Sequence, residues 1–169
     1  MKLGWKRLAV VLLLFAQLQF FLTAARSQHS RSANPLAAME WLVGDWSIEA
    51  KTNQKVYGQV HYRRALGGNG ISFEYVSPSG QQTKSGMFRY DPSTASIVYT
   101  ASGVSGEPAL GHAFLGPDAV LLEYNLSTRS GEQVHLRARL TRIDANLYEN
   151  IEGDDPTSLV YRRVIKKPS

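Results

Sequence analysis

The 169-residue sequence contains no cysteine. This absence excludes disulfide bonds, a thiolate nucleophile, a lipid anchor carried on cysteine and any cysteine-ligated metal site. A chain of this length can bury enough surface for one domain with a core of its own. The fold must therefore be held together by noncovalent packing.

The chain also has little excess charge once its first residues are set aside. The formal net charge is +5, from 19 basic and 14 acidic residues. Three of the basic residues and none of the acidic ones lie within residues 1–25, which leaves 16 basic against 14 acidic residues and a net charge of +2. A nearly neutral domain gives no support for a nucleic-acid partner or an anionic membrane surface.

The first 25 residues have the composition of a secretory signal peptide. They contain in order a positive start, an apolar run and a small-residue cleavage site (Lys2, Lys6 and Arg7; 8–22; TAA at 23–25). We expect cleavage of residues 1–25, a flexible polar leader over 26–35, and a secreted or periplasmic protein. The alternative is a retained anchor, and the chain would then contact a membrane only through this segment.

Helical periodicity is scarce in the rest of the sequence. Asn34 and Pro35 can cap and start one short helix, whose apolar residues recur at helical spacing (Leu36, Met39, and Leu42 or Val43). Gly44 can end it. No other segment has a convincing helical period.

Short apolar stretches separated by turn sequences follow to the end of the chain. They predict ten strands: 45–51, 56–66, 71–77, 82–90, 95–102, 109–116, 119–127, 133–143, 147–153 and 158–165. The connections are mostly too short for crossover helices, so neighbouring strands must be antiparallel. We therefore expect an all-β fold, a single antiparallel up-and-down β-barrel over 36–165 preceded by one short helix, with a tail at 166–169. A sandwich is the alternative architecture.

Alternation along the strands separates two faces, but it does not decide which face points inward. In the simpler interpretation the apolar faces fill the barrel and the polar faces meet water. In the alternative a polar face lines a wet cavity, as in some small barrels. Arg137 and Arg139 could then clamp a ligand carboxylate.

The stretch LVGDW, with Gly44 and Trp46 entering the first strand after a short helix, resembles the calycin superfamily of lipocalins, fatty-acid-binding proteins and nitrobindin-like barrels. FRYDPST, LLEYNLSTRSGE and a closing YRR extend the likeness to a bacterial family of secreted lipocalin-like domains without an assigned function. The resemblance covers roughly residues 36–165. It implies that Trp46 closes one end of the barrel and packs against Arg162 or Arg163 as a cation–π partner.

The resemblance further implies that the barrel binds a small apolar or amphipathic molecule without catalysis. The candidate ligand-binding residues are Tyr62, Phe73, Tyr75, Tyr99, His112, His135, Arg137 and Arg139, and no catalytic residue is assigned. The alternative is a calycin-like enzyme that performs acid–base chemistry, such as an isomerase or lyase. It would need His61, His112 or His135 within hydrogen-bond reach of a carboxylate such as Glu74 or Glu123.

We predict neither a cofactor nor a metal. The four histidines are widely separated and form no HxH or HExxH motif. Nitrobindin-like barrels hold haem through a histidine near the last strand, where this chain has residues 156–158, PTS. A haem held by His112 or His135 is the alternative. The sequence does not indicate an oligomeric state.

Overall fold

The computed structural model describes residues 34–153 and 159–165. The predicted signal peptide, nearly all of the leader and the tail lie outside the described residues. The helix expected after the leader is present as η1 (Pro35–Leu42), and the side chain of Asn34 accepts a hydrogen bond of 3.0 Å from the amide of Leu36. It is a 3₁₀ helix, in which side chains three residues apart line up. This alignment brings Leu36, Met39 and Leu42 onto one buried face.

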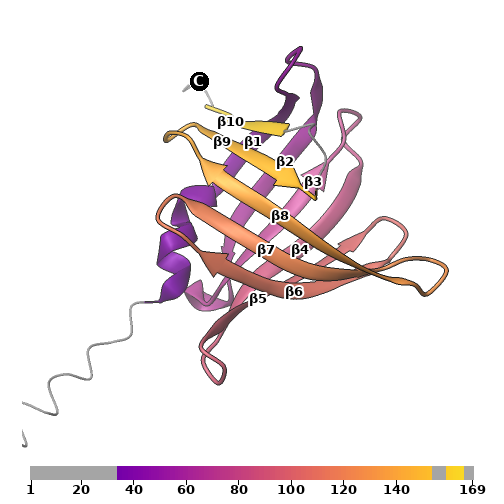
Figure 1. Ribbon diagram of the computed structural model, residues 1–169. Helices are drawn as coiled ribbons and strands as arrows, with labels where there is room; N and C mark the ends of the chain where they lie inside the picture. The colour runs from indigo at the N-terminus through magenta and orange to yellow at the C-terminus, as the bar shows by residue number, and fades with distance from the viewer. Residues whose placement is uncertain (1–33, 154–158, 166–169) are drawn as a thin grey trace, which may run out of the picture. The chain divides into compact units, whose positions relative to one another are not determined.

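Ten antiparallel strands follow η1 and confirm the predicted all-β barrel. They are β1 (Gly44–Ala50), β2 (Val56–Ala65), β3 (Gly70–Val76), β4 (Gln82–Asp91), β5 (Ser96–Gly103), β6 (Pro108–Leu115), β7 (Ala119–Ser127), β8 (Gln133–Arg142), β9 (Leu147–Glu152) and β10 (Leu159–Arg163). A short 3₁₀ turn, η2 (Leu66–Gly68), connects β2 to β3. Each strand pairs with its neighbour in sequence, and β1 pairs with β10. The sheet is thus a closed up-and-down barrel and has no free edge (Figure 1).

The apolar faces of the strands point inward, as in the simpler interpretation of the sequence. On β2, Val60 and Tyr62 are buried, whereas Gln59 and Arg63 are exposed. On β8, Ala138 and Leu140 are buried. Since consecutive side chains in a strand alternate between faces, the residues between them lie on the outer wall.

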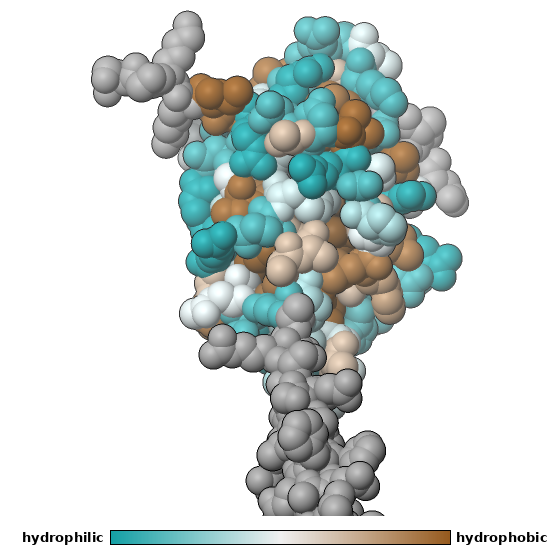
Figure 2. All heavy atoms as spheres, turned by 90° about the vertical axis from the view of Figure 1, so that its left-hand side faces the viewer, coloured by the Kyte–Doolittle hydropathy of each residue, from teal (hydrophilic) through white to brown (hydrophobic). Residues whose placement is uncertain are grey.

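The two ends of the barrel differ. Helix η1 and the loops at 66–69, 92–95, 116–118 and 143–146 belong to one end (Figure 1). The loops at 51–55, 77–81, 104–107 and 128–132 belong to the other. The face seen from the η1 side mixes hydrophilic and hydrophobic side chains (Figure 2). Within the described ranges, no helix has the length and apolar character needed to cross a membrane.

Candidate ligand-binding cavity

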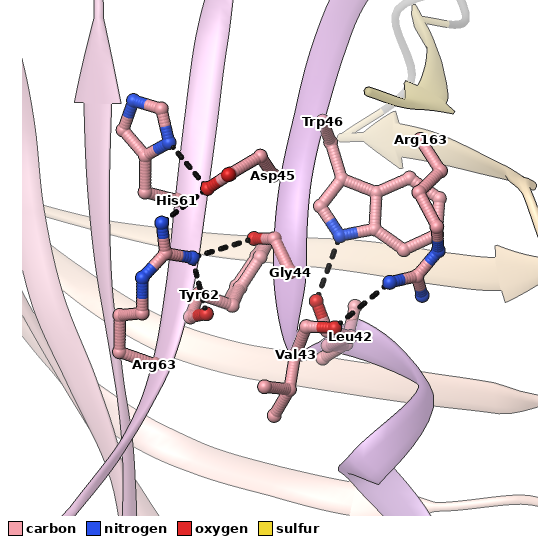
Figure 3. Close-up of polar contacts among 9 residues, drawn as sticks. All are labelled: Leu42, Val43, Gly44, Asp45, Trp46, His61, Tyr62, Arg63 and Arg163. Atoms are coloured by element: carbon pink, nitrogen blue, oxygen red, sulfur yellow. Dashed lines mark hydrogen bonds and ion pairs between the residues drawn. The ribbon is translucent and has the colours of Figure 1, made fainter. Parts of the chain in front are cut away.

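Trp46 forms the floor of the barrel at the η1 end (Figure 3). Its side chain is buried, and its indole Nε1 donates a hydrogen bond of 2.7 Å to the carbonyl of Leu42. The guanidinium of Arg163 lies over the ring, with Cζ 4.3 Å from the centroid. The same guanidinium donates to the carbonyls of Trp41 and Val43 at 2.8 and 3.0 Å. Arg163 therefore connects η1 to the last strand.

Of the two arginines considered for this contact, Arg163 makes it and Arg162 does not. Arg162 points to the outer wall, where its Nε lies 3.0 Å from a carboxylate oxygen of Glu49. Gly44 leaves room for the floor, because a Cβ at this position would lie 2.5 Å from the Nη1 of Arg163. Its φ of 143° also favours glycine. The first residue of the Gly-x-Trp motif is thus required by both space and backbone geometry.

Asp45, the middle residue of the motif, points outward and holds a small polar cluster (Figure 3). Its carboxylate bonds to the Nδ1 of His61 at 2.8 Å and forms an ion pair with Arg63. Burial by itself raises the pKa of Asp45, but the hydrogen bonds from Arg63 and His61 outweigh it, so that the pKa lies below its usual value. This cluster orders the outer wall beside the floor and lies outside the barrel interior.

A chamber of about 210 Å³ lies inside the barrel. Its wall is largely aromatic, formed by Tyr62, Phe73, Tyr75, Phe88, Tyr99, Tyr124 and Tyr161. The rings of Phe73 and Tyr99 stack with 5.8 Å between centroids and an interplanar angle of 10°. Such a wall offers flat apolar surfaces to a ligand, and the hydroxyl groups add polar contacts. We call this space the deep chamber.

The inward residues of strand β9 show how far the interior polar groups lie from the floor of the barrel. Its inward residues are Tyr148, Asn150 and Glu152, spaced by two positions. Tyr148 packs edge-on against Trp46, with 4.8 Å between centroids, and so belongs to the floor. Glu152 ends the strand at the opposite end. Asn150 therefore lies about midway between the floor and the open end.

A second, outer chamber of about 420 Å³ lies toward the loops at the open end. Its wall includes Ala101, Ala109, Leu126 and Leu136, and its rim includes Glu107 and Arg129, which form an ion pair of 2.8 Å. Three side chains line both chambers, namely Lys84, Tyr124 and Glu152. We call these three residues the neck.

The neck places opposite charges beside an aromatic ring. The hydroxyl of Tyr124 donates a hydrogen bond to the carboxylate of Glu152. The ammonium of Lys84 lies 5.8 Å from the ring centroid of Tyr75 and 5.9 Å from that of Tyr124. A ligand that passes from one chamber to the other must contact these groups.

Burial controls the protonation of the tyrosines around the deep chamber. It raises the pKa of each of the six inward tyrosines above the usual value (Tyr62, Tyr75, Tyr99, Tyr124, Tyr148 and Tyr161). Desolvation is the largest cause in every case, because a buried phenolate loses its hydration. All six hydroxyls are therefore neutral at physiological pH and can both donate and accept hydrogen bonds.

Four of the residues predicted to bind a ligand line the deep chamber: Tyr62, Phe73, Tyr75 and Tyr99. The other four do not. His112, His135, Arg137 and Arg139 are exposed on the outer faces of β6 and β8. Arg137 and Arg139 therefore do not line the inner wall, because their strand neighbours Ala138 and Leu140 occupy it.

The outward residues instead have partners on the surface. Arg137 forms an ion pair of 3.0 Å with Glu123, and the Nδ1 of His135 lies 3.1 Å from the amide oxygen of Asn125. His61 contacts Asp45 outside the barrel. The acid–base pair of histidine and carboxylate that an enzyme would need inside the barrel is therefore absent among the described residues.

The sequence prediction missed the polar residues of the interior: Lys84, Tyr124, Asn150 and Glu152. The only signal was the two-residue spacing of Tyr148, Asn150 and Glu152. That signal is weak, because the opposite face of the same strand, with Leu147, Glu149 and Ile151, is also mixed in polarity.

The described residues do not fit a haem bound through histidine inside the barrel. His61 lies on the outer wall with its Nδ1 bonded to Asp45, and His112 and His135 are exposed. In the part of the chain that the structure describes, no three histidine or acidic side chains cluster closely enough to hold a metal ion. The contacts of the interior therefore come from aromatic rings, hydroxyls, one amide and the charged pair at the neck.

No family model matches the chain. No curated protein matches it either. Among solved structures, the crystal structure of Rv2717c from M. tuberculosis is similar, with 15% sequence identity and a TM-score of 0.46 over 79% of this chain and 99% of that chain. A backbone likeness at this level carries no information about a ligand or an activity.

Proposed function

We propose that the protein is an exported calycin-type barrel that binds a small amphipathic molecule in its interior without catalysis. The observation that carries the proposal is the pair of chambers inside the barrel, which share the side chains of the neck and lie above the floor formed by Trp46. Ligand sites of this kind are concave and mainly apolar, with few well-placed polar groups. The aromatic walls supply the apolar contacts, and the hydroxyls with Asn150 supply the polar ones.

Binding is favoured over acid–base catalysis by the position of the histidines. All three described histidines lie on the outer wall, so none of them reaches a molecule in the cavity. The inward tyrosines stay protonated at neutral pH and cannot act as general bases there. These groups suit orientation of a ligand by hydrogen bonding.

Blocking the deep chamber tests the proposal. Ala138 is buried and lines this chamber, so Ala138→Phe would fill part of it. Native mass spectrometry of the protein isolated from its own host should detect a bound small molecule in the wild type and a reduced amount in this variant. Arg139→Phe adds the same ring to the outer wall and is the matched control.

The control variant should retain the ligand. The proposal would be wrong if repeated isolation of the wild type yielded no bound species and 2-naphthol, a small aromatic alcohol, also failed to bind. Equal ligand retention by the two variants would place the ligand outside the deep chamber.

Export is the second part of the proposal and rests on the first 25 residues. Cleavage after Ala25 would give a mature protein that begins at Arg26. The intact mass of the protein from its host measures this directly. A full-length chain recovered from a membrane fraction would favour a retained anchor instead.

A further inference from the structure

The middle of the deep chamber contains an amide with unused hydrogen-bonding capacity. The Nδ2 of Asn150 donates to the hydroxyl of Tyr161 over 3.4 Å, a long bond. The Oδ1 of Asn150 is buried and has no hydrogen-bond partner among the described residues. Buried polar groups are normally paired, and Asn150 lines the deep chamber, so its unpaired carbonyl points to a partner supplied by a ligand.

A donor lies next to this acceptor. The hydroxyl of Tyr161 accepts the bond from Asn150 and still has its own proton to donate. The hydroxyl of Tyr75 interacts with that of Tyr161 in the sense of a donor, since this contact raises the pKa of Tyr75 and lowers the pKa of Tyr161. Deeper in the barrel, the hydroxyls of Tyr62 and Tyr148 bond to each other at 3.3 Å. The free acceptor and the free donor are thus found together at the level of Asn150.

Among the residues that the structure describes, none at this level carries a formal charge. The charged groups that line the chamber, Lys84 and Glu152, belong to the neck. There Lys84 contacts aromatic rings, and Glu152 accepts the hydrogen bond from Tyr124. Below the neck the polar groups are neutral hydroxyls and an amide. A charged group brought to that depth would lose its hydration without meeting an opposite charge.

We propose that the deep chamber selects the head group of the ligand, an uncharged group that donates to Oδ1 of Asn150 and accepts from the hydroxyl of Tyr161. A phenol, an alcohol or a primary amide has this chemistry. The ligand enters head first, its ring or chain packs against Phe73 and Tyr99, and its apolar remainder extends past the neck toward Leu126 and Leu136. This inference rests on the proposed function and adds the chemical class of the ligand.

Three probes that share one ring system separate the possible heads. 2-Naphthol donates and accepts, 2-methoxynaphthalene only accepts, and 2-naphthoate is an anion at neutral pH. We expect titration calorimetry to give about tenfold tighter binding of 2-naphthol than of 2-methoxynaphthalene, because the ether leaves the buried carbonyl unpaired. The anion should bind more weakly than either.

Two variants test whether Asn150 is the source of the preference for 2-naphthol. Asn150→Leu removes the acceptor and keeps the number and branching of the side-chain heavy atoms, so the preference for 2-naphthol over 2-methoxynaphthalene should fall to nearly onefold while the ether still binds. Asn125→Leu makes the same substitution on the exposed face of β7 and should leave the preference unchanged. If Asn150→Leu does not fold, the binding of the three probes to the wild type still tests whether the chamber selects an uncharged head group that donates a hydrogen bond.

The outcomes separate this inference from the function on which it rests. Equal binding of 2-naphthol and 2-methoxynaphthalene by the wild type would overturn the head-group inference and leave a ligand-binding barrel. Tightest binding of 2-naphthoate would also overturn it, since the head would then lie at Lys84. Failure of all three probes to bind would count against both proposals. A preference for 2-naphthol that survives in Asn150→Leu would overturn the assignment to Asn150.

Discussion

The guanidinium of Arg163 lies over the indole of Trp46 and at the same time donates to the carbonyls of Trp41 and Val43. One side chain thus joins the last strand of the barrel to the helix that precedes the first strand. The indole itself is fixed by its bond to Leu42. The carbonyls at the end of η1, which would otherwise be unpaired, thus accept hydrogen bonds from a residue of the last strand.

Arg163→Lys should lower the free energy of unfolding by about 2 kcal/mol, because an ammonium cannot stack on the indole and hold two carbonyls at once. Urea denaturation followed by tryptophan fluorescence measures the change. Arg162→Lys is the matched control, since its partner Glu49 lies on the outer wall, and should cost less than about 0.5 kcal/mol. Equal losses in the two variants would contradict the role of Arg163.

The buried tyrosines should make the fold sensitive to alkali. Their folded pKa values are raised by burial, whereas an unfolded tyrosine ionises near pH 10. Above about pH 10 the unfolded state loses protons that the folded state retains, so each such tyrosine lowers the free energy of unfolding by about 1.4 kcal/mol per pH unit. The contribution is fully present below that pH and is lost as the pH rises.

Unfolding in urea at a series of alkaline pH values measures this slope, with tyrosinate absorbance as a second signal. Tyr62→Phe removes one of the ionising groups and should reduce the slope by one proton. Smooth ionisation of every tyrosine near its ordinary pKa in the folded protein would contradict the buried arrangement.

Gly86 has no room for a side chain. A Cβ at this position would collide with the carbonyl oxygen of Thr100 and the ring of Phe73. Gly86→Ala should therefore cost about 1–3 kcal/mol of stability and weaken binding of 2-naphthol, because the ring of Phe73, which lines the deep chamber, must move. At Gly103 a Cβ would meet only the Oε2 of Glu107, at 3.7 Å. Gly103→Ala is accordingly the control and should leave stability and affinity nearly unchanged.

The strand boundaries could be predicted from the sequence because the turns are chemically distinct and the connections are short. The helix start at Asn34 and Pro35 and the Gly44–Trp46 motif were equally local signals. The sequence could not predict which face of a strand such as 147–152 points into the barrel. Tyr148, Asn150 and Glu152 alternate there with residues of similarly mixed polarity. A polar residue inside a barrel is stabilised by partners from other strands, and one strand does not reveal those partners.

Arg137 and Arg139 were considered as residues of the inner wall, whereas the structure places them on the outer wall. A polar stripe on a strand is compatible with either a wet lumen or a solvated outer wall. Small inward residues such as Ala138 leave space for the aromatic rings of other strands, and this packing determines the orientation of β8. The decisive quantity is the volume of the interior, which depends on all ten strands together.

The neck should control how fast a ligand exchanges. The bond from Tyr124 to Glu152 holds two of the three neck side chains together, and we expect these side chains to move when a molecule leaves the deep chamber. Tyr124→Phe removes this bond and keeps the ring, so the dissociation rate of 2-naphthol should rise several-fold while stability falls by about 1 kcal/mol or less. Stopped-flow displacement of the probe measures the rate. Tyr57→Phe removes the same atom from an exposed tyrosine and should leave the rate unchanged. If both variants released the probe at the wild-type rate, the passage between the chambers would not limit exchange, and the ligand would have another way out of the barrel.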